Sequence, residues 1–172
     1  MNLPNKLTVA RIVAVPIFCV LYVLGLRWPA FIIFIAASIT DFFDGRIARK
    51  RGLVTNFGKI MDPLADKILV YSAFTLMVAN DTVPAWMLIV ILFREFIVAG
   101  MRTVAASEGI VIAAGKTGKI KTALQMVAVP MLILDIPGLW HTIAVITLWA
   151  STVMTVVSGA EYIYQNRKVF SM

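Results

Sequence analysis

Long apolar stretches alternate with short polar or turn-forming segments along the whole chain. Each stretch has about the 20 residues that a membrane-spanning helix needs, and none shows the period-two alternation typical of strands. The pattern therefore predicts an all-α, polytopic membrane protein. We expect residues 1–172 to form one domain of six transmembrane helices around a polar cavity that faces the cytoplasm. The predicted helices are Leu7–Leu26, Trp28–Ala48, Gly58–Ala79, Pro84–Ser107, Lys119–Asp135 and Leu139–Tyr164.

The distribution of basic residues predicts the orientation of these helices. Of the three short turns between them, only the first carries a basic residue, Arg27, whereas most other lysines and arginines lie near the opposite helix ends. Because basic residues are retained on the cytoplasmic side of a membrane, we expect both termini and the connections 50–57 and 108–118 to be cytoplasmic. No convincing cleavage site follows the first apolar stretch, so we expect it to be retained as a helix in the bacterial cell membrane.

The composition supports a membrane location. Hydrophobic residues make up 60% of the chain, the mean hydropathy is +0.90 and the net charge is +7. A soluble domain is nearer half apolar, and the basic residues lie at the ends of apolar stretches. They therefore favour membrane orientation and anionic phosphate ligands over nucleic acid. With only Cys19 and His141, a disulfide framework or a zinc site is not expected.

Four aspartates lie at the facing ends of the second and third predicted helices. Asp41 and Asp44 are three residues apart and Asp62 and Asp66 are four apart, so each pair shares one helix face. Carboxylates at membrane depth are rare and usually functional. Bound metal would relieve their mutual repulsion, and oxygen ligands alone suit Mg²⁺ or Mn²⁺. We expect a two-metal site that assists displacement at phosphorus.

Two features beside the aspartates have alternative interpretations. The small residues Gly45, Ala48 and Gly58 either leave room for a nucleotide and its pyrophosphate or allow close packing of helices. The alternative for the aspartates is a set of salt bridges with neighbouring cations. Those cations are Arg46, Arg49, Lys59 and Lys67.

The segment from Asp41 to Asp66 reads D-x-x-D-G-x-x-A-R-x8-G-x3-D-x3-D. It resembles the signature of the CDP-alcohol phosphotransferase family, whose members transfer a phosphatidyl or similar group from a CDP-linked donor to an alcohol and release CMP. The resemblance implies that Asp41, Asp44 and Asp62 are metal ligands. It also implies that Asp66 is the general base and lies close to the second metal.

The same resemblance implies where the CDP-linked donor binds. Gly45 and Arg49 would contact the CDP moiety, and Thr55 falls where the family often has a hydroxyl residue near the pyrophosphate. The segment from Pro4 to Arg11 resembles the part of the family that lies on the cytidine side, although a helix cap with cytoplasmic charge is an equal alternative. The expected donor-binding residues are Asn5, Thr8, Gly45, Ala48, Arg49, Thr55 and Gly58.

A second region, 93–102 with 115–125, looks like bacterial phosphatidylglycerophosphate synthases, which use sn-glycerol 3-phosphate as acceptor. A phosphomonoester needs several cations, and arginine can bind it through two hydrogen bonds. We expect Arg94, Arg102, Lys119 and Lys121 to bind the acceptor phosphate. The two lysines have an alternative role in anchoring the helix at the cytoplasmic surface, and Glu95 would neutralise a nearby cation.

The resemblance thus implies an enzyme of phospholipid biosynthesis. It would transfer the phosphatidyl group from CDP-diacylglycerol to sn-glycerol 3-phosphate, giving phosphatidylglycerophosphate and CMP, and it would form a homodimer. One alternative is the same chemistry with another acceptor, such as inositol phosphate. The other is a divalent-cation transporter, which requires acidic residues spread along the depth of several helices rather than clustered at one level.

Overall fold

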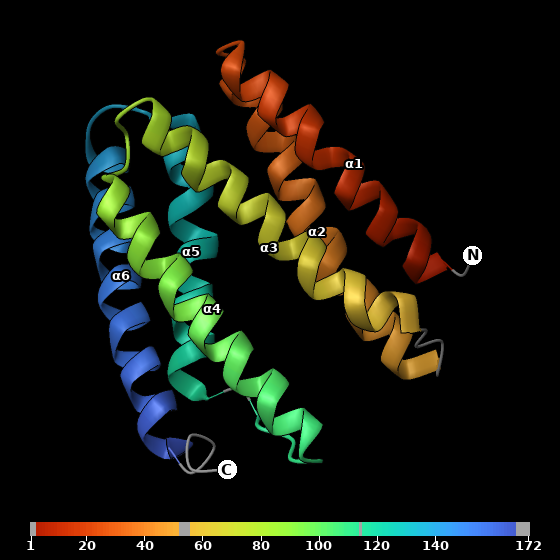
Figure 1. The fold of residues 1–172 in the computed structure, drawn as a ribbon. Helices are drawn as coiled ribbons and strands as arrows, with labels where there is room; N and C mark the ends of the chain where they lie inside the picture. Colours follow the sequence, from red (N-terminus) through yellow and green to blue (C-terminus); the bar gives the residue numbers. More distant parts are fainter. Residues whose placement is uncertain (1–2, 52–55, 114, 168–172) are drawn as a thin grey trace. The chain divides into compact units, whose positions relative to one another are not determined.

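A computed structural model describes the backbone of residues 3–51, 56–113 and 115–167. It describes their side chains too, except those of 3–4, 41–51, 56–60, 62–63 and 66. These ranges contain six helices and no strand, so the predicted all-helical fold is confirmed (Figure 1). The helices are α1 (Leu3–Val23), α2 (Arg27–Arg51), α3 (Asn56–Ala79), α4 (Ala85–Ser107), α5 (Lys116–Leu134) and α6 (Leu139–Gln165).

Four helices, α1, α2, α3 and α5, extend beyond a predicted end by two or more residues. Helix α1 begins at Leu3, because Pro4 is well tolerated in a first helical turn. Helix α2 continues to Arg51, since lysine and arginine are good helix formers, and α3 begins at Asn56. The predicted connection 50–57 was therefore too long. Helix α5 begins at Lys116 rather than Lys119, and the backbone N–H of Lys119 donates to the carbonyl of Gly115 at 3.3 Å to close its first turn.

The chain forms two compact units, of which the first comprises Met1–Asn80 and Ile133–Asp135. Within it, α1 packs against α2 and α3. Phe18 is fully buried, and its ring centroid lies 5.9 Å from those of both Tyr22 and Phe34. The Tyr22 hydroxyl accepts a hydrogen bond from Nδ2 of Asn80 at 2.9 Å. These contacts fix the ends of α1 and α3 to each other.

The second unit comprises Asp81–Leu132 and Ile136–Met172, and in it α4 packs against α6. Val98 and Met101 of α4 form a buried cluster with Tyr162 of α6. Large apolar side chains are also buried along α4, among them Met87 and Ile91. The α4–α6 contact thus gives the charged residues of α4 a fixed position relative to α6.

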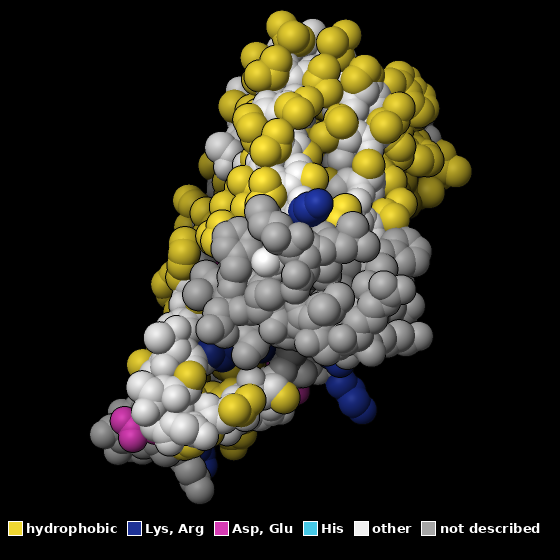
Figure 2. All heavy atoms as spheres, turned by 90° about the vertical axis from the view of Figure 1, so that its right-hand side faces the viewer, with side chains coloured by type: hydrophobic (Ala, Val, Ile, Leu, Met, Phe, Trp, Pro, Cys, Tyr) yellow, Lys and Arg dark blue, Asp and Glu magenta, His cyan; other side chains and the backbone are white. Residues whose placement is uncertain are grey.

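Two helices of the described part are long and apolar enough to cross a membrane. They are Asn5–Val23, with a mean hydropathy of 1.9, and Leu139–Gln165, with 1.8. Apolar side chains such as Val20, Val23 and Leu24 are exposed, and Figure 2 shows hydrophobic side chains over the upper part of one face. Such exposure is expected where lipid covers the protein. These helices and the exposed apolar side chains indicate a membrane protein, whereas six spans and a central polar cavity stay predictions.

Candidate functional site

The four aspartates lie on two helices of the first unit. Asp41 and Asp44 belong to α2, and Asp62 and Asp66 belong to α3. The helical backbone places each pair on one face, as predicted, because residues three or four apart are neighbours on a helix. The two helices contact each other within this unit. The side chains of all four lie outside the described residues, so metal coordination stays a prediction.

The donor set suits the predicted metal. Four carboxylates offer only oxygen ligands, which hard cations such as Mg²⁺ and Mn²⁺ prefer. Among the side chains that the structure describes, no group of three or more histidine, cysteine or acidic residues offers another metal site. The aspartates are therefore the candidate for a divalent metal.

The predicted donor-binding residues fall into two groups. Asn5 and Thr8 lie on α1 and are buried, as is Arg11 one turn further along the same helix face. Buried polar side chains along one face of an apolar helix are unusual. In the sequence, the spacing of three residues between Asn5, Thr8 and Arg11 is the feature that indicates this arrangement. Basic side chains that only mark orientation are expected at the surface, so the burial of Arg11 favours a role inside the protein.

The side chains of the remaining predicted donor-binding residues lie outside the described part of the structure. Gly45, Ala48 and Arg49 lie in the last part of α2, and Gly58 lies in the first turn of α3. Thr55 falls in the segment 52–55, outside the described residues. Their contacts with a CDP moiety therefore stay predictions.

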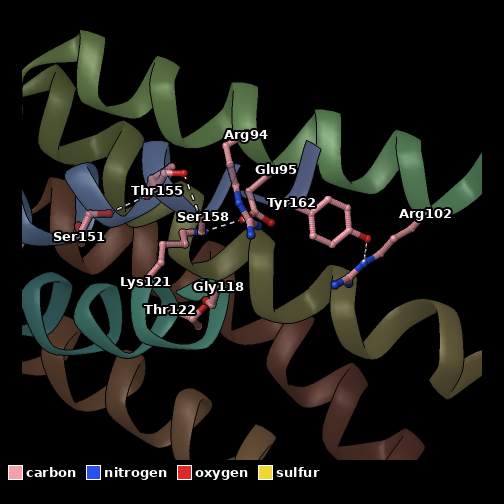
Figure 3. A network of polar contacts seen from close by, with 10 residues as sticks. All are labelled: Arg94, Glu95, Arg102, Gly118, Lys121, Thr122, Ser151, Thr155, Ser158 and Tyr162. Atoms are coloured by element: carbon pink, nitrogen blue, oxygen red, sulfur yellow. Dashed lines mark hydrogen bonds and ion pairs between the residues drawn. The ribbon is translucent and has the colours of Figure 1, made fainter. Parts of the chain in front are cut away.

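In the second unit, two predicted acceptor residues meet at one carboxylate (Figure 3). Nη1 of Arg94 donates to Oε1 of Glu95 at 2.7 Å, and Nζ of Lys121 donates to the same oxygen at 2.6 Å. The side chain of Lys121 is only 4% exposed, and those of Arg94 and Glu95 are 13% and 11% exposed. Glu95 thus forms ion pairs with two cations, whereas the sequence predicted that it neutralises one.

Two glycines make room for Arg94. A Cβ atom at Gly159 of α6 would lie 3.0 Å from Cγ of Arg94, and one at Gly118 of α5 would lie 3.0 Å from its Nη2. The Arg94 side chain also lines an apolar cavity of about 470 Å³ with Phe93 and Ile97. Its aliphatic part is therefore packed among apolar groups while its charged end reaches Glu95, as is common for arginine at apolar surfaces.

The other two predicted acceptor residues do not join this pair in the described contacts. Arg102 is exposed, and its Nε donates to the hydroxyl of Tyr162 at 3.1 Å (Figure 3). Lys119 is also exposed, on the first turn of α5. The structure therefore separates a largely buried pair, Arg94 and Lys121, from an exposed one.

Helix α6 supplies residues that the sequence did not single out. Besides Gly159, they include Glu161, whose Oε2 accepts a hydrogen bond from Oγ1 of Thr117 at 2.6 Å. This contact fixes the first turn of α5 to α6, next to Gly118. In the sequence, Glu161 is recognisable only as a carboxylate near the end of an apolar helix. Such a residue is typical of an ordinary charge at the membrane interface.

The hydroxyl groups along α6 have a structural explanation. Oγ1 of Thr155 donates to the carbonyl of Ser151 at 2.7 Å, and Oγ of Ser158 donates to the carbonyl of Thr155 at 3.2 Å. Such bonds satisfy a hydroxyl within its own helix. We therefore assign these side chains to packing.

The chain matches known proteins over almost its whole length. The family model described as CDP-alcohol phosphatidyltransferase matches residues 1–157. A protein of Bacillus subtilis (strain 168) named CDP-diacylglycerol–glycerol-3-phosphate 3-phosphatidyltransferase is 46% identical, and the match covers 96% of this chain and 95% of that protein. Proteins of the same name from Rickettsia felis and Escherichia coli K12 are 38% and 35% identical. Those matches cover 98% and 96% of this chain and 97% and 95% of the relatives.

Both the match to the family model and the relatives cover the two helices with the aspartates and the α4–α5 region with Arg94 and Lys121. The aspartate spacing had suggested the same family. The chain therefore belongs to the CDP-alcohol phosphatidyltransferase family.

Proposed function

We propose that this protein transfers the phosphatidyl group from CDP-diacylglycerol to sn-glycerol 3-phosphate, with phosphatidylglycerophosphate and CMP as products. The observation that carries the proposal is the similarity, at 46% identity over 96% of the chain, to a relative named for this reaction. The aspartate spacing and the largely buried Arg94–Lys121 pair support it, because they would supply a metal site and a phosphate site.

The donor is held by the first unit in this proposal. Asp41, Asp44 and Asp62 would hold the divalent metal, Mg²⁺ or Mn²⁺, with Asp66 close to a second ion. Ions held by these residues would supply positive charge that offsets the charge of a pyrophosphate and of the leaving CMP. Residues of α1 and α2, including Asn5, Thr8 and Arg49, bind and orient the CDP moiety. The acyl chains stay in lipid.

Residues of α4 and α5 bind the acceptor in this proposal. Arg94 and Lys121 bind the phosphate of glycerol 3-phosphate, and the exposed Arg102 and Lys119 attract it from the cytoplasm. Asp66 accepts the proton of the acceptor's terminal hydroxyl as general base. The hydroxyl oxygen forms a bond to the lipid-side phosphorus as the bond from that phosphorus to the CMP oxygen breaks. The proton ends on Asp66, and CMP leaves as the anion.

The membrane arrangement belongs to the same proposal. Six spans in the bacterial cytoplasmic membrane, with both termini and the reaction on the cytoplasmic side, agree with the distribution of lysine and arginine. In this arrangement a lipid-soluble donor and a water-soluble acceptor reach the same membrane surface. The family resemblance also supports a homodimer.

The test is CMP release by the purified protein from CDP-diacylglycerol, with and without glycerol 3-phosphate. We expect release only with acceptor and with Mg²⁺ or Mn²⁺, loss of release on chelation, and phosphatidylglycerophosphate as the lipid product by mass spectrometry. Release with inositol phosphate but not with glycerol 3-phosphate would identify another acceptor. Metal flux into vesicles without CMP release would instead favour a transporter.

The acceptor site has its own test. Arg94→Ala should raise the apparent KM for glycerol 3-phosphate more than the KM for CDP-diacylglycerol, because only the acceptor loses a phosphate contact. Equal effects on the two KM values would argue against an acceptor site at Arg94.

A further inference from the structure

We propose that Glu95 is a positioning residue for the acceptor site. Its carboxylate holds the guanidinium of Arg94 and the ammonium of Lys121 in the arrangement that binds the phosphate of glycerol 3-phosphate. The inference rests on the proposed function, and it concerns contacts within the second unit alone. Glu95 itself does not touch the substrate in this account, because it acts through the two cations.

A single carboxylate oxygen of Glu95 contacts both cations. Arg94 and Lys121 both donate to Oε1 of Glu95, at 2.7 and 2.6 Å. Arg94 is the neighbour of Glu95 on α4, whereas Lys121 lies 26 residues away on α5. The carboxylate therefore determines the distance between two cations that come from different helices. Charge-assisted hydrogen bonds of this length are the strong ones among protein hydrogen bonds.

Glu95 also balances the charge of the two cations. Lys121 has a side chain that is only 4% exposed, and a buried ammonium without an anion would be strongly destabilising. Two cations brought to one place also repel each other, more strongly at a partly buried site than in water. Glu95 relieves both problems. The formal charges of these three groups, two positive and one negative, leave one positive charge among them.

Glu95 occupies only part of the hydrogen-bonding capacity of the Arg94 guanidinium. It uses Nη1 of Arg94, whereas Nε of Arg94 is buried and has no hydrogen-bond partner in the part of the chain that the structure describes. Nε and Nη2 together form the edge of a guanidinium that can bind an oxyanion through two hydrogen bonds. Nη2 faces Gly118, where a side chain would crowd it. Glu95 and the glycines thus orient one edge of Arg94.

A rival interpretation is that Glu95 occupies the position of the phosphate and competes with it. A neutral residue at this position would then improve binding of the acceptor. The unpartnered Nε of Arg94 favours positioning instead, since an oxyanion bound at the edge formed by Nε and Nη2 would leave the hydrogen bond from Nη1 to Glu95 in place. The two interpretations predict opposite changes in the KM for glycerol 3-phosphate.

The decisive experiment is the steady-state kinetics of Glu95→Gln in the full-length protein, assayed in mixed micelles with glycerol 3-phosphate and CDP-diacylglycerol. We expect the KM for glycerol 3-phosphate to rise by about tenfold and the KM for CDP-diacylglycerol by less than about twofold. Glu108→Gln is the matched control, because Glu108 is exposed at the end of α4, and its KM values should not change. An unchanged or lower KM for glycerol 3-phosphate in Glu95→Gln, or an equal rise in both KM values, would overturn the proposal.

A second variant covers the case in which Glu95→Gln does not fold. Glu95→Asp keeps the charge but is one methylene shorter, so it should fold and still raise the KM for glycerol 3-phosphate by about threefold, because it cannot reach both cations at once. An unchanged KM in Glu95→Asp contradicts the proposal. In a Lys121→Gln background the additional effect of Glu95→Gln should shrink, since residues that act as a unit are not additive. Full additivity would also contradict it.

Assays of the wild-type protein distinguish a failure of the proposed function from a failure of the positioning role of Glu95. If it forms no phosphatidylglycerophosphate from glycerol 3-phosphate, the proposed function fails. If it forms that product while Glu95→Gln keeps the wild-type KM for glycerol 3-phosphate, only the positioning role of Glu95 fails.

Discussion

Gly159 of α6 lies directly against the side chain of Arg94 on α4. A Cβ atom at Gly159 would come within 3.0 Å of Cγ and 3.8 Å of Cβ of Arg94. The absence of a side chain at position 159 therefore lets the stem of Arg94 lie along α6 while its charged end reaches Glu95. A single methyl group at this position would push the stem toward another rotamer.

Gly159→Ala tests this relationship. An off-rotamer side chain costs about 0.5–1.5 kcal/mol, so we expect the KM for glycerol 3-phosphate to rise by roughly two- to tenfold. The KM for CDP-diacylglycerol should change little. Gly100→Ala is the matched control on α4, because a Cβ there meets nothing within 4 Å, and alanine is the better helix former. Equal kinetics of the two variants would show that the contact with Arg94 has no effect on acceptor binding.

Asp66→Asn tests the proposed general base. Loss of a general base typically lowers the rate by about 10²–10⁴-fold, and the amide should leave much of the donor affinity intact. The measurement combines the kcat for CMP release with CDP-diacylglycerol binding at equilibrium. Asp81→Asn provides the control, since Asp81 is exposed with φ 60°, a conformation that asparagine tolerates. Full activity in Asp66→Asn would exclude its role as base.

Tyr162→Phe tests the contribution of Arg102. The variant removes the hydroxyl that accepts the hydrogen bond from Nε of Arg102 but keeps the ring that packs with Val98 and Met101. A hydrogen bond to a charged group contributes about 1.5–3 kcal/mol at most, and Arg102 is exposed. We expect a two- to fivefold rise, roughly, in the KM for glycerol 3-phosphate.

The control for that variant lies two residues further along α6. Tyr164 is 70% exposed, so Tyr164→Phe should leave the KM for glycerol 3-phosphate unchanged. If Tyr162→Phe also leaves this KM unchanged, the hydrogen bond between Arg102 and Tyr162 does not contribute to acceptor binding.

Phe34→Ala tests the packing of α1 against α2 in the first unit. Phe34 is fully buried against Phe18, and loss of such a ring costs about 3–5 kcal/mol in protein cores. The Tm of the protein in detergent should fall by roughly 6–20 °C. Phe96→Ala, at a position that is 71% exposed, should leave the Tm nearly unchanged. Similar Tm values for the two variants would contradict the assigned core.

Several features followed from local sequence. The six apolar stretches predicted six helices, because a long run of helix-forming apolar residues determines its own backbone, and each of the six occurs. Helix ends were less well predicted at Arg51 and Lys116, where charged residues continue a helix as readily as they end it. The spacing of the four aspartates already indicated two helical pairs, since positions three and four apart always share a helix face.

Other features depend on contacts between residues far apart in sequence. Helical spacing alone could not show that Lys121 of α5 meets Glu95 of α4, or that Arg102 turns to Tyr162 instead of joining Arg94. Nor could it identify Gly118 and Gly159 as the residues that flank Arg94, because a glycine has no chemical signal until its neighbours are known. The helices and the pairing of the four aspartates on helix faces are thus predictable from local periodicity, whereas the choice of partner for each buried charge depends on how separate helices pack.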